Sequence, residues 1–212
     1  MVKMKDGLTP EQHLKYTLKW VREGHGLYVG IDPGASGAIG FVVSSHSDLI
    51  RYHVMDIPTF KVSRTGKTKG GKAKTKTVPD NAAIIAIFKP FEPYADRVRV
   101  CLEMGVVQVK GRGASAYNGF RVGCNYGCWP LFLQSLGFRL HVVMPGVWKK
   151  EFKLAGKEKE DSRQLALQWF PKADLQNKGH HDRAEALLLS DYGRRVFDGF
   201  VKEESEDVWP AE

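Results

Sequence analysis

An acidic residue ends the most strongly β-forming stretch of the chain. Residues 27–43 read LYVGIDPGASGAIGFVV, in which two apolar and β-branched runs flank a glycine-rich turn. This pattern predicts two consecutive strands. Asp32 ends the first strand at a position that should belong to the core of a sheet, and an isolated carboxylate is costly to bury. The stretch therefore predicts the start of a sheet and a site that uses Asp32.

The order of the remaining segments predicts one main α/β domain. A chain of 212 residues with 42% hydrophobic content can bury one sizeable core. Three meandering strands, followed by helices that alternate with two more strands, predict a mixed five-stranded sheet with helices on both faces. The expected strands are 27–32, 37–43, 49–55, 97–104 and 138–144, and the expected helices are 80–90, 119–136, 158–170 and 182–197. Pro130 can kink or split the second of these helices.

Additional segments flank or interrupt this domain. Residues 1–26 are expected to be an N-terminal extension, in which the capping-box sequence TPEQ at 9–12 predicts an amphipathic helix that ends at Gly24. The main domain is expected to span 27–197, with a basic loop at 58–78 that lacks regular structure, and 198–212 form an acidic tail.

Charge and composition restrict the class of protein. The net charge is +8, and residues 61–77 hold seven Lys or Arg and no acid, so the rest of the chain carries a net charge of only +1. A run of like charge is usually a solvated segment, but it can also bind nucleic acid. No apolar run approaches the ~18 residues of a membrane span, and no export signal is evident. We expect a soluble protein of the cytoplasm or of an organelle nucleoid.

The three cysteines do not predict a metal site. Cys101, Cys124 and Cys128 have neither CxxC spacing nor a histidine-rich partner segment. We expect them to be buried small residues in a reducing compartment.

Four acidic residues fall where one fold would bring them together. Asp32 and Glu103 end the first and fourth expected strands. If these two strands are neighbours, the two carboxylates lie side by side. Asp182 and Glu185 are three residues apart, so a helix presents both on one face. Four carboxylates in one cleft repel one another, and a divalent cation such as Mg²⁺ removes that cost. Alternatively, Asp32 caps a turn, Glu103 is a surface acid and Asp182 is a helix N-cap.

Several motifs resemble a known family. GIDPGASGAIG, VCLEM and HHDRAEALLLSDYGRR resemble, in this order, the motifs of RuvC-type Holliday junction resolvases, which have an RNase H-like fold. The resemblance covers about residues 27–197 and is closest to the phage and organellar branch, which includes the chloroplast resolvases. The segments shared with that branch are MDIPTFKV, GFRVGCNYGCW, VWKKEFKL and KEDSRQLALQWFP.

The resemblance implies an active site and its cofactor. It matches Asp32, Glu103, Asp182 and Glu185 to the catalytic acids, which hold Mg²⁺ or Mn²⁺, two ions per site, and hydrolyse a phosphodiester with activated water. His181 is a rival for the role of Asp182. Lysines that assist the chemistry or grip the phosphate have four candidates here, which are Lys149, Lys150, Lys157 and Lys159.

The resemblance also implies contacts with DNA and with a second subunit. The loop after Glu103 offers basic and aromatic contacts to the junction, namely Lys110, Arg112, Tyr117, Phe120 and Arg121. The basic loop would add Lys67, Lys69, Lys72, Lys74 and Lys76. A homodimer is implied because paired nicks need two sites related by a two-fold axis. Part of the dimer contact, or equally of the core, is expected around Trp129, Phe132, Leu133 and Leu136.

The function expected from these features is symmetric cleavage of four-way DNA junctions. One alternative is an RNase H-like nuclease that acts on RNA/DNA hybrids or on other branched DNA. Another is a junction-binding protein without activity, although such a protein has no reason to place acids against phosphate. An actin-like ATP-binding protein would need two domains of this kind, and the chain is too short for them.

Overall fold

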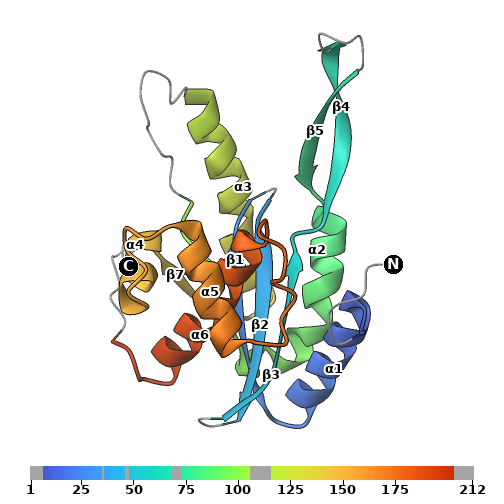
Figure 1. Ribbon diagram of the computed structural model, residues 1–212. Coiled ribbons are helices and arrows are strands. Elements are labelled where there is room, and N and C mark those ends of the chain that lie inside the picture. Colours follow the sequence, from blue (N-terminus) through green and yellow to red (C-terminus); the bar gives the residue numbers. More distant parts are fainter. Residues whose placement is uncertain (1–6, 35, 46–47, 68–72, 106–115, 203–212) are drawn as a thin grey trace, which may run out of the picture.

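A mixed five-stranded sheet forms the centre of the protein (Figure 1). The computed structural model describes residues 7–34, 36–45, 48–67, 73–105 and 116–202. The strand order is β3-β2-β1-β6-β7, in which β1, β2 and β3 are antiparallel and β6 and β7 run parallel to β1. The bounds are β1 Gly26–Asp32, β2 Ala38–Ser45, β3 Asp48–Asp56, β6 Val98–Glu103 and β7 Arg139–Val143. The mixed five-stranded sheet expected from the sequence, with three antiparallel strands followed by two parallel ones, is thereby confirmed.

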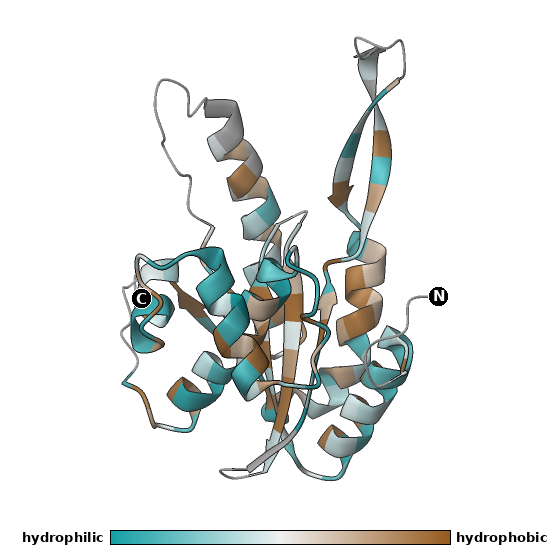
Figure 2. Cartoon of the chain, viewed as in Figure 1, coloured by the Kyte–Doolittle hydropathy of each residue, from teal (hydrophilic) through white to brown (hydrophobic). Residues whose placement is uncertain are grey.

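Helices cover both faces of this sheet and enclose two apolar clusters. One cluster lies between the sheet and α4, α5 and α6, and the other lies between the sheet and α1, α2, η1 and α3. The bounds are α1 Pro10–Arg22, α2 Asn81–Phe88, the 3₁₀ helix η1 Lys89–Arg97, α3 Ala116–Ser135, α4 Pro145–Glu151, α5 Lys159–Trp169 and α6 His181–Phe197. In Figure 2 the central strands are largely brown, as expected for strands buried on both faces.

The structure adds two details to the expected helices. Helix α3 continues through Pro130 without a break, and α4 is a short helix of its own between β7 and α5. Within the ranges that the structure describes, none of the helices has the length and apolarity that crossing a bilayer requires.

Helix α6 lies very close to the sheet. Gly30 and Gly40 face each other across β1 and β2, and the backbone of α6 passes directly over both. A Cβ atom on Gly30 would lie 2.3 Å from the carbonyl oxygen of Ala186, and one on Gly40 would lie 2.5 Å from the same atom. The Gly30 N–H also donates to Ser190 Oγ at 2.9 Å. These two glycines therefore determine how closely α6 approaches the strands that lead to Asp32.

The N-terminal helix α1 packs on the sheet as part of the same core. Its expected capping box is confirmed, because Thr9 Oγ1 accepts from the Gln12 N–H and Gln12 Oε1 accepts from the Thr9 N–H. Its buried face contains His13, Thr17 and Val21. The helix is held partly by polar residues, which its apolar periodicity does not reveal.

A stack of rings with a buried histidine joins α1 to β3. His53 is 2% exposed and lies between Phe41 and His13, with ring centroids 4.4 Å and 5.1 Å away. His53 Nδ1 is 3.3 Å from Thr17 Oγ1, whereas the buried Nε2 has no hydrogen-bond partner among the described residues. Burial, with help from the positive charges of His13 and Arg51, holds the pKa of His53 well below its usual value.

We expect this histidine to destabilise the fold in acid. Unfolded His53 takes up a proton near pH 6.5, whereas the folded ring stays neutral, so stability falls as pH drops below 6.5. Between pH 7.5 and 5.5 the melting temperature of wild type should fall relative to that of His53→Phe by about 3–5 °C. Differential scanning fluorimetry at both pH values measures this difference. Parallel pH profiles for the two proteins would contradict the assignment.

The basic insertion forms a β-hairpin instead of the expected loop. Strands β4, Thr59–Lys67, and β5, Ala73–Pro79, pair antiparallel in a separate two-stranded sheet. The physical reason is the recurrence of threonine and valine between the lysines, because β-branched residues favour an extended backbone even in an exposed segment. Figure 1 shows that the hairpin and α3 project past the same end of the central sheet, where the connection between β1 and β2 lies.

Most of the residues expected in a dimer contact are buried in the core, and other residues of α3 are exposed. Trp129, Leu133 and Leu136 are at most 7% exposed and pack in the core, so that part of the expected contact surface is not available to a partner. Phe120 and Leu131 are instead 69% and 76% exposed. A continuous apolar run does not reveal which of its residues face the sheet, because almost every turn of the helix carries apolar residues.

Candidate active site

Two neighbouring strands end in carboxylates at the same edge of the sheet. The parallel register pairs Ile31 of β1 with Leu102 of β6. The next residues along the two strands are Asp32 and Glu103, so the structure places them side by side, as expected from the sequence. Both residues are partly buried, because each is the last residue of a strand in the central sheet.

The pKa of Asp32 shows that Asp182 and Glu185 of α6 lie near it as well. Burial, followed by the negative charges of Glu103, Asp182 and Glu185, raises the pKa of Asp32 to about 7. The carboxylates from β1, β6 and α6 therefore interact, although they are far apart in sequence. At neutral pH Asp32 is poised between its protonated and ionised forms, which is the cost of gathering like charges in a half-buried site.

Glu103 is held by an indole that sequence reasoning missed. Trp148 of α4 is completely buried, and its Nε1–H donates to Glu103 Oε2 at 2.7 Å. Burial raises the pKa of Glu103, whereas this hydrogen bond acts in the opposite direction. The one available sequence signal was the tryptophan next to the two lysines in VWKK.

The two carboxylates of α6 are paired with lysines. Lys149 Nζ lies 2.8 Å from Glu185 Oε1, and Ser162 Oγ donates to the same oxygen at 3.2 Å. Lys159 Nζ lies 3.2 Å from Asp182 Oδ1. Partial burial acts to lower the pKa of Lys159, but the nearby acids outweigh it and raise this pKa. Two ammonium groups thus balance part of the negative charge.

Arg183, which lies between Asp182 and Glu185 in the sequence, anchors the start of α6. Arg183 forms a fork with Asp56 at the end of β3, with distances of 2.6 and 2.7 Å, and also pairs with Asp174 at 2.6 Å. His180, which is the N-cap residue, lies with its Nδ1 2.9 Å from the Asp174 carbonyl oxygen. Asp182 is inside the first turn and is not the N-cap. These contacts fix the turn that carries Asp182.

The donor set fits a divalent metal in its chemistry. Hard carboxylate oxygens on rigid elements are the ligands that Mg²⁺ and Mn²⁺ prefer. Burial, and after it repulsion from the other acids, raises the pKa of Asp32, and a cation would relieve both costs of its negative charge. Among the described residues, no three His, Cys, Asp or Glu side chains lie close enough together to hold an ion in their present positions. The buried Nδ1 of His181 has no hydrogen-bond partner within the described part of the chain, so His181 stays a candidate beside Asp182.

The other expected site residues divide into three groups. Of the four candidate lysines, Lys149 and Lys159 pair with the acids of α6, and Lys150, Lys157 and Lys159 itself are exposed. Phe120 is exposed on α3, and β5 carries Lys74 and Lys76. The remaining expected DNA contacts lie outside the described residues or have side chains that are not described, namely Lys67, Lys69, Lys72, Lys110, Arg112, Tyr117 and Arg121.

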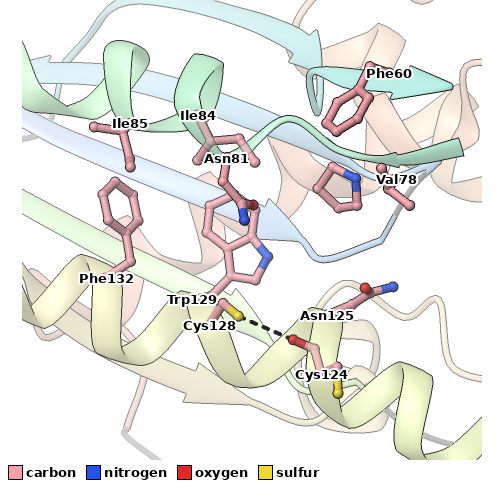
Figure 3. A pocket seen from close by; sticks show the side chains of 11 residues that line it. Phe60, Val78, Asn81, Ile84, Ile85, Cys124, Asn125, Cys128, Trp129 and Phe132 are labelled. Carbon is pink, nitrogen blue, oxygen red and sulfur yellow. Dashed lines mark hydrogen bonds between the residues drawn. The ribbon is translucent and has the colours of Figure 1, made fainter. Parts of the chain in front are cut away.

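An apolar cavity of about 530 Å³ lies elsewhere, between α2, α3 and the base of the hairpin (Figure 3). Its walls include Phe60, Ile84 and Trp129, and the four carboxylates do not line it. Cys124 and Cys128 at its edge are free and exposed, whereas Cys101 is buried. The expectation that all three cysteines are buried was therefore wrong for Cys124 and Cys128, because these positions of α3 do not face the apolar core.

Comparisons with known proteins give similarity at the level of structure alone. No protein-family model and no curated protein matches the chain. The Thermus thermophilus RuvC structure matches with a TM-score of 0.44 and 12% identity, covering 81% of this chain and 97% of that chain. T. thermophilus RuvC in complex with Holliday junction substrate matches with a TM-score of 0.47 and 14% identity, covering 80% of this chain and 95% of that chain.

Proposed function

We propose that the protein is a divalent-metal-dependent endonuclease that resolves four-way DNA junctions. The single observation that carries this proposal is the convergence of Asp32, Glu103, Asp182 and Glu185 at one edge of the sheet, where burial and then the charges of the other three acids raise the pKa of Asp32 to about 7. A protein that only bound DNA would lose affinity by placing four acids against phosphate. A nuclease gains from them, because they hold the metal that its reaction requires.

The residues of the site have distinct tasks in this reaction. Asp32 and Glu103 hold the metal from the sheet, and Asp182 with Glu185, or His181 in place of Asp182, hold it from α6. A bound pair of Mg²⁺ or Mn²⁺ ions would supply an activated water and stabilise the leaving oxygen of the phosphodiester. Lys149 and Lys159, which pair with the α6 acids, are placed to contact the phosphate once the metal takes over those carboxylates.

Two projections beside the site would hold the DNA. The basic hairpin β4–β5 and α3 extend past the end of the sheet where the acids lie (Figure 1). Lysines on the hairpin neutralise phosphates, and Phe120 with the preceding loop meets bases near the branch point. Junction DNA seated between these projections would bring its backbone to the four carboxylates.

The hairpin lysines should set the salt dependence of DNA binding. Changing Lys67, Lys69, Lys72, Lys74 and Lys76 together to alanine removes up to five phosphate contacts, each contributing a slope of roughly 0.9 in a plot of log K against log salt. We expect weaker junction binding and a slope lower by about 2–4. Fluorescence anisotropy at several salt concentrations measures both. An unchanged slope would show that the hairpin does not contact DNA.

A homodimer is part of the proposal, because symmetric nicks need two sites related by a two-fold axis. The exposed Phe120 and Leu131 are eleven residues apart, which is about three turns, so they lie on the same side of α3. Contact between two α3 helices at Leu131 would leave Phe120, nearer the start of the same helix, available to the DNA. Leu131→Asp is expected to give a monomer by light scattering, whereas Phe200→Asp, at an exposed apolar residue outside α3, should not. Equal masses for both variants would place the contact elsewhere.

A comparison of substrates tests the proposed function. Wild-type protein is incubated with an end-labelled immobile four-way junction and with a linear RNA/DNA hybrid, in Mg²⁺ and in Ca²⁺. We expect symmetric nicks in two opposing strands of the junction in Mg²⁺ only, junction binding in both ions, and an intact hybrid. Cleavage of the hybrid without cleavage of the junction would favour the RNase H-like alternative. Binding without cleavage in both Mg²⁺ and Mn²⁺ would favour a binding protein.

A further inference from the structure

Helix α4 presents two consecutive residues to two different carboxylates. Trp148 donates to Glu103 Oε2 on β6 at 2.7 Å, and Lys149 pairs with Glu185 Oε1 on α6 at 2.8 Å. The Lys149 ammonium also lies 5.2 Å from the centre of the Trp148 ring. This short helix therefore contacts the strand side and the helix side of the cluster at once.

We propose that Trp148 is a positioning residue that fixes the orientation of Glu103 for metal binding. The inference rests on the proposed function and adds a residue that acts through Glu103 without touching the DNA or the metal. Its basis is geometric, since a fully buried indole has one N–H donor, and this donor is directed at one of the two oxygens of Glu103.

The two partners offered by α4 differ in how easily they can be displaced. Lys149 is on a flexible stem and is 26% exposed in its side chain, so its ammonium can leave Glu185 when a cation arrives. Trp148 is packed against Phe152 with ring centroids 6.2 Å apart, and its neutral indole cannot swing away. A hydrogen bond that holds Oε2 leaves Oε1 free to coordinate, and groups that orient metal ligands in this way typically contribute 10- to 100-fold to metal affinity.

A purely structural role for Trp148 makes different predictions. If the indole only filled the core, its loss would lower stability and leave metal binding by the folded protein unchanged. Trp169 of α5 provides the matched control, because it packs in the same apolar cluster and its ring contacts are with Phe152 and Arg195.

The test compares Trp148→Phe with Trp169→Phe in direct metal binding. Mn²⁺ affinity is measured on folded protein without DNA, by electron paramagnetic resonance or calorimetry, beside the melting temperature of each variant. We expect Trp148→Phe to weaken Mn²⁺ binding by about 10- to 100-fold and Trp169→Phe to leave it within about twofold. Junction affinity in Ca²⁺ should be unchanged for Trp148→Phe. Equal Mn²⁺ affinity in both variants at matched folding would overturn the proposal.

A double-mutant cycle with Glu103→Gln asks whether Trp148 acts through Glu103. In the Glu103→Gln background, the further change Trp148→Phe should cost little additional Mn²⁺ affinity, whereas independent roles would give additive losses. Additivity would overturn the proposal.

Wild-type protein allows a measurement that does not depend on folding of the Trp148 variant. The sequentially assigned indole N–H resonance of Trp148 should shift on Mg²⁺ addition more than that of Trp169. An unchanged chemical shift of the Trp148 indole N–H at saturating Mg²⁺ would overturn the proposal. Metal binding with these signatures but without junction cleavage would refute the proposed function and leave the role of Trp148 intact.

Discussion

Asp32→Asn should cut four-way junctions at least 10³-fold more slowly than wild type in Mg²⁺ and still bind them. The substitution removes a charged metal ligand but keeps the size of the side chain, and loss of metal-derived stabilisation worth several kcal/mol lowers the rate by three or more decades. Single-turnover cleavage of a labelled junction measures the rate, and a mobility shift in Ca²⁺ measures binding. Cutting at the wild-type rate would remove Asp32 from the mechanism.

The stability of Asp32→Asn provides the control for misfolding. The folded-state pKa of Asp32 is raised to about 7, whereas the unfolded carboxyl titrates near 4, so ionisation of this group destabilises the metal-free fold as pH rises from about 4 through 7. At pH 8 without metal, the Asn variant should therefore melt several degrees higher than wild type. Added Mg²⁺ should stabilise wild type more than the variant. A lower melting temperature for the variant at pH 8 would contradict this account.

Gly30→Ala should prevent folding or lower the free energy of unfolding by at least about 4 kcal/mol. The new Cβ would lie 2.3 Å from the Ala186 carbonyl oxygen and 2.4 Å from the Ser190 nitrogen, and both contacts are to backbone, which no change of rotamer can relieve. Helix α6 would have to move away from the sheet, exposing part of the core and displacing Asp182 and Glu185. Urea denaturation followed by circular dichroism measures the loss.

Gly146→Ala is the matched control for the Gly30 substitution. A Cβ on Gly146 meets nothing within 4 Å, and the residue lies in the first turn of α4. Replacing an exposed helical glycine by alanine should be neutral or stabilise the protein by up to about 1 kcal/mol. Equal effects of the two substitutions would show that α6 does not press on β1 as closely as described.

The sequence predicted the sheet and its acidic edge because both depend on local patterns. The apolar and β-branched runs on either side of Gly34 predicted the first two strands. Asp32 and Glu103 end two of the expected strands, and they meet because β1 and β6 are parallel neighbours. The hairpin was missed because lysine content suggested solvation, while the threonines between the lysines favoured strands. Composition was a poorer guide there than the alternation of side chains.

The partners of the acids could not be predicted, because they depend on distances between elements. Trp148 reads as an ordinary core residue, and only the approach of α4 to the end of β6 turns its indole toward Glu103. Likewise, the resemblance left four lysines as candidates for contact with phosphate, and the structure adds that two of them, Lys149 and Lys159, pair with the α6 acids. Which face of α3 is buried could not be predicted either, because it depends on how the helix lies against the sheet.

The fork of Arg183 ties together three parts of the chain that no local pattern connects. Its guanidinium joins the end of β3, through Asp56, to the segment before α6, through Asp174. A change at Asp56 would therefore affect α6 as well as β3, since the first turn of α6 would lose one of its two anchors. Engineering of this protein should treat these three residues as one unit that can be exchanged only together.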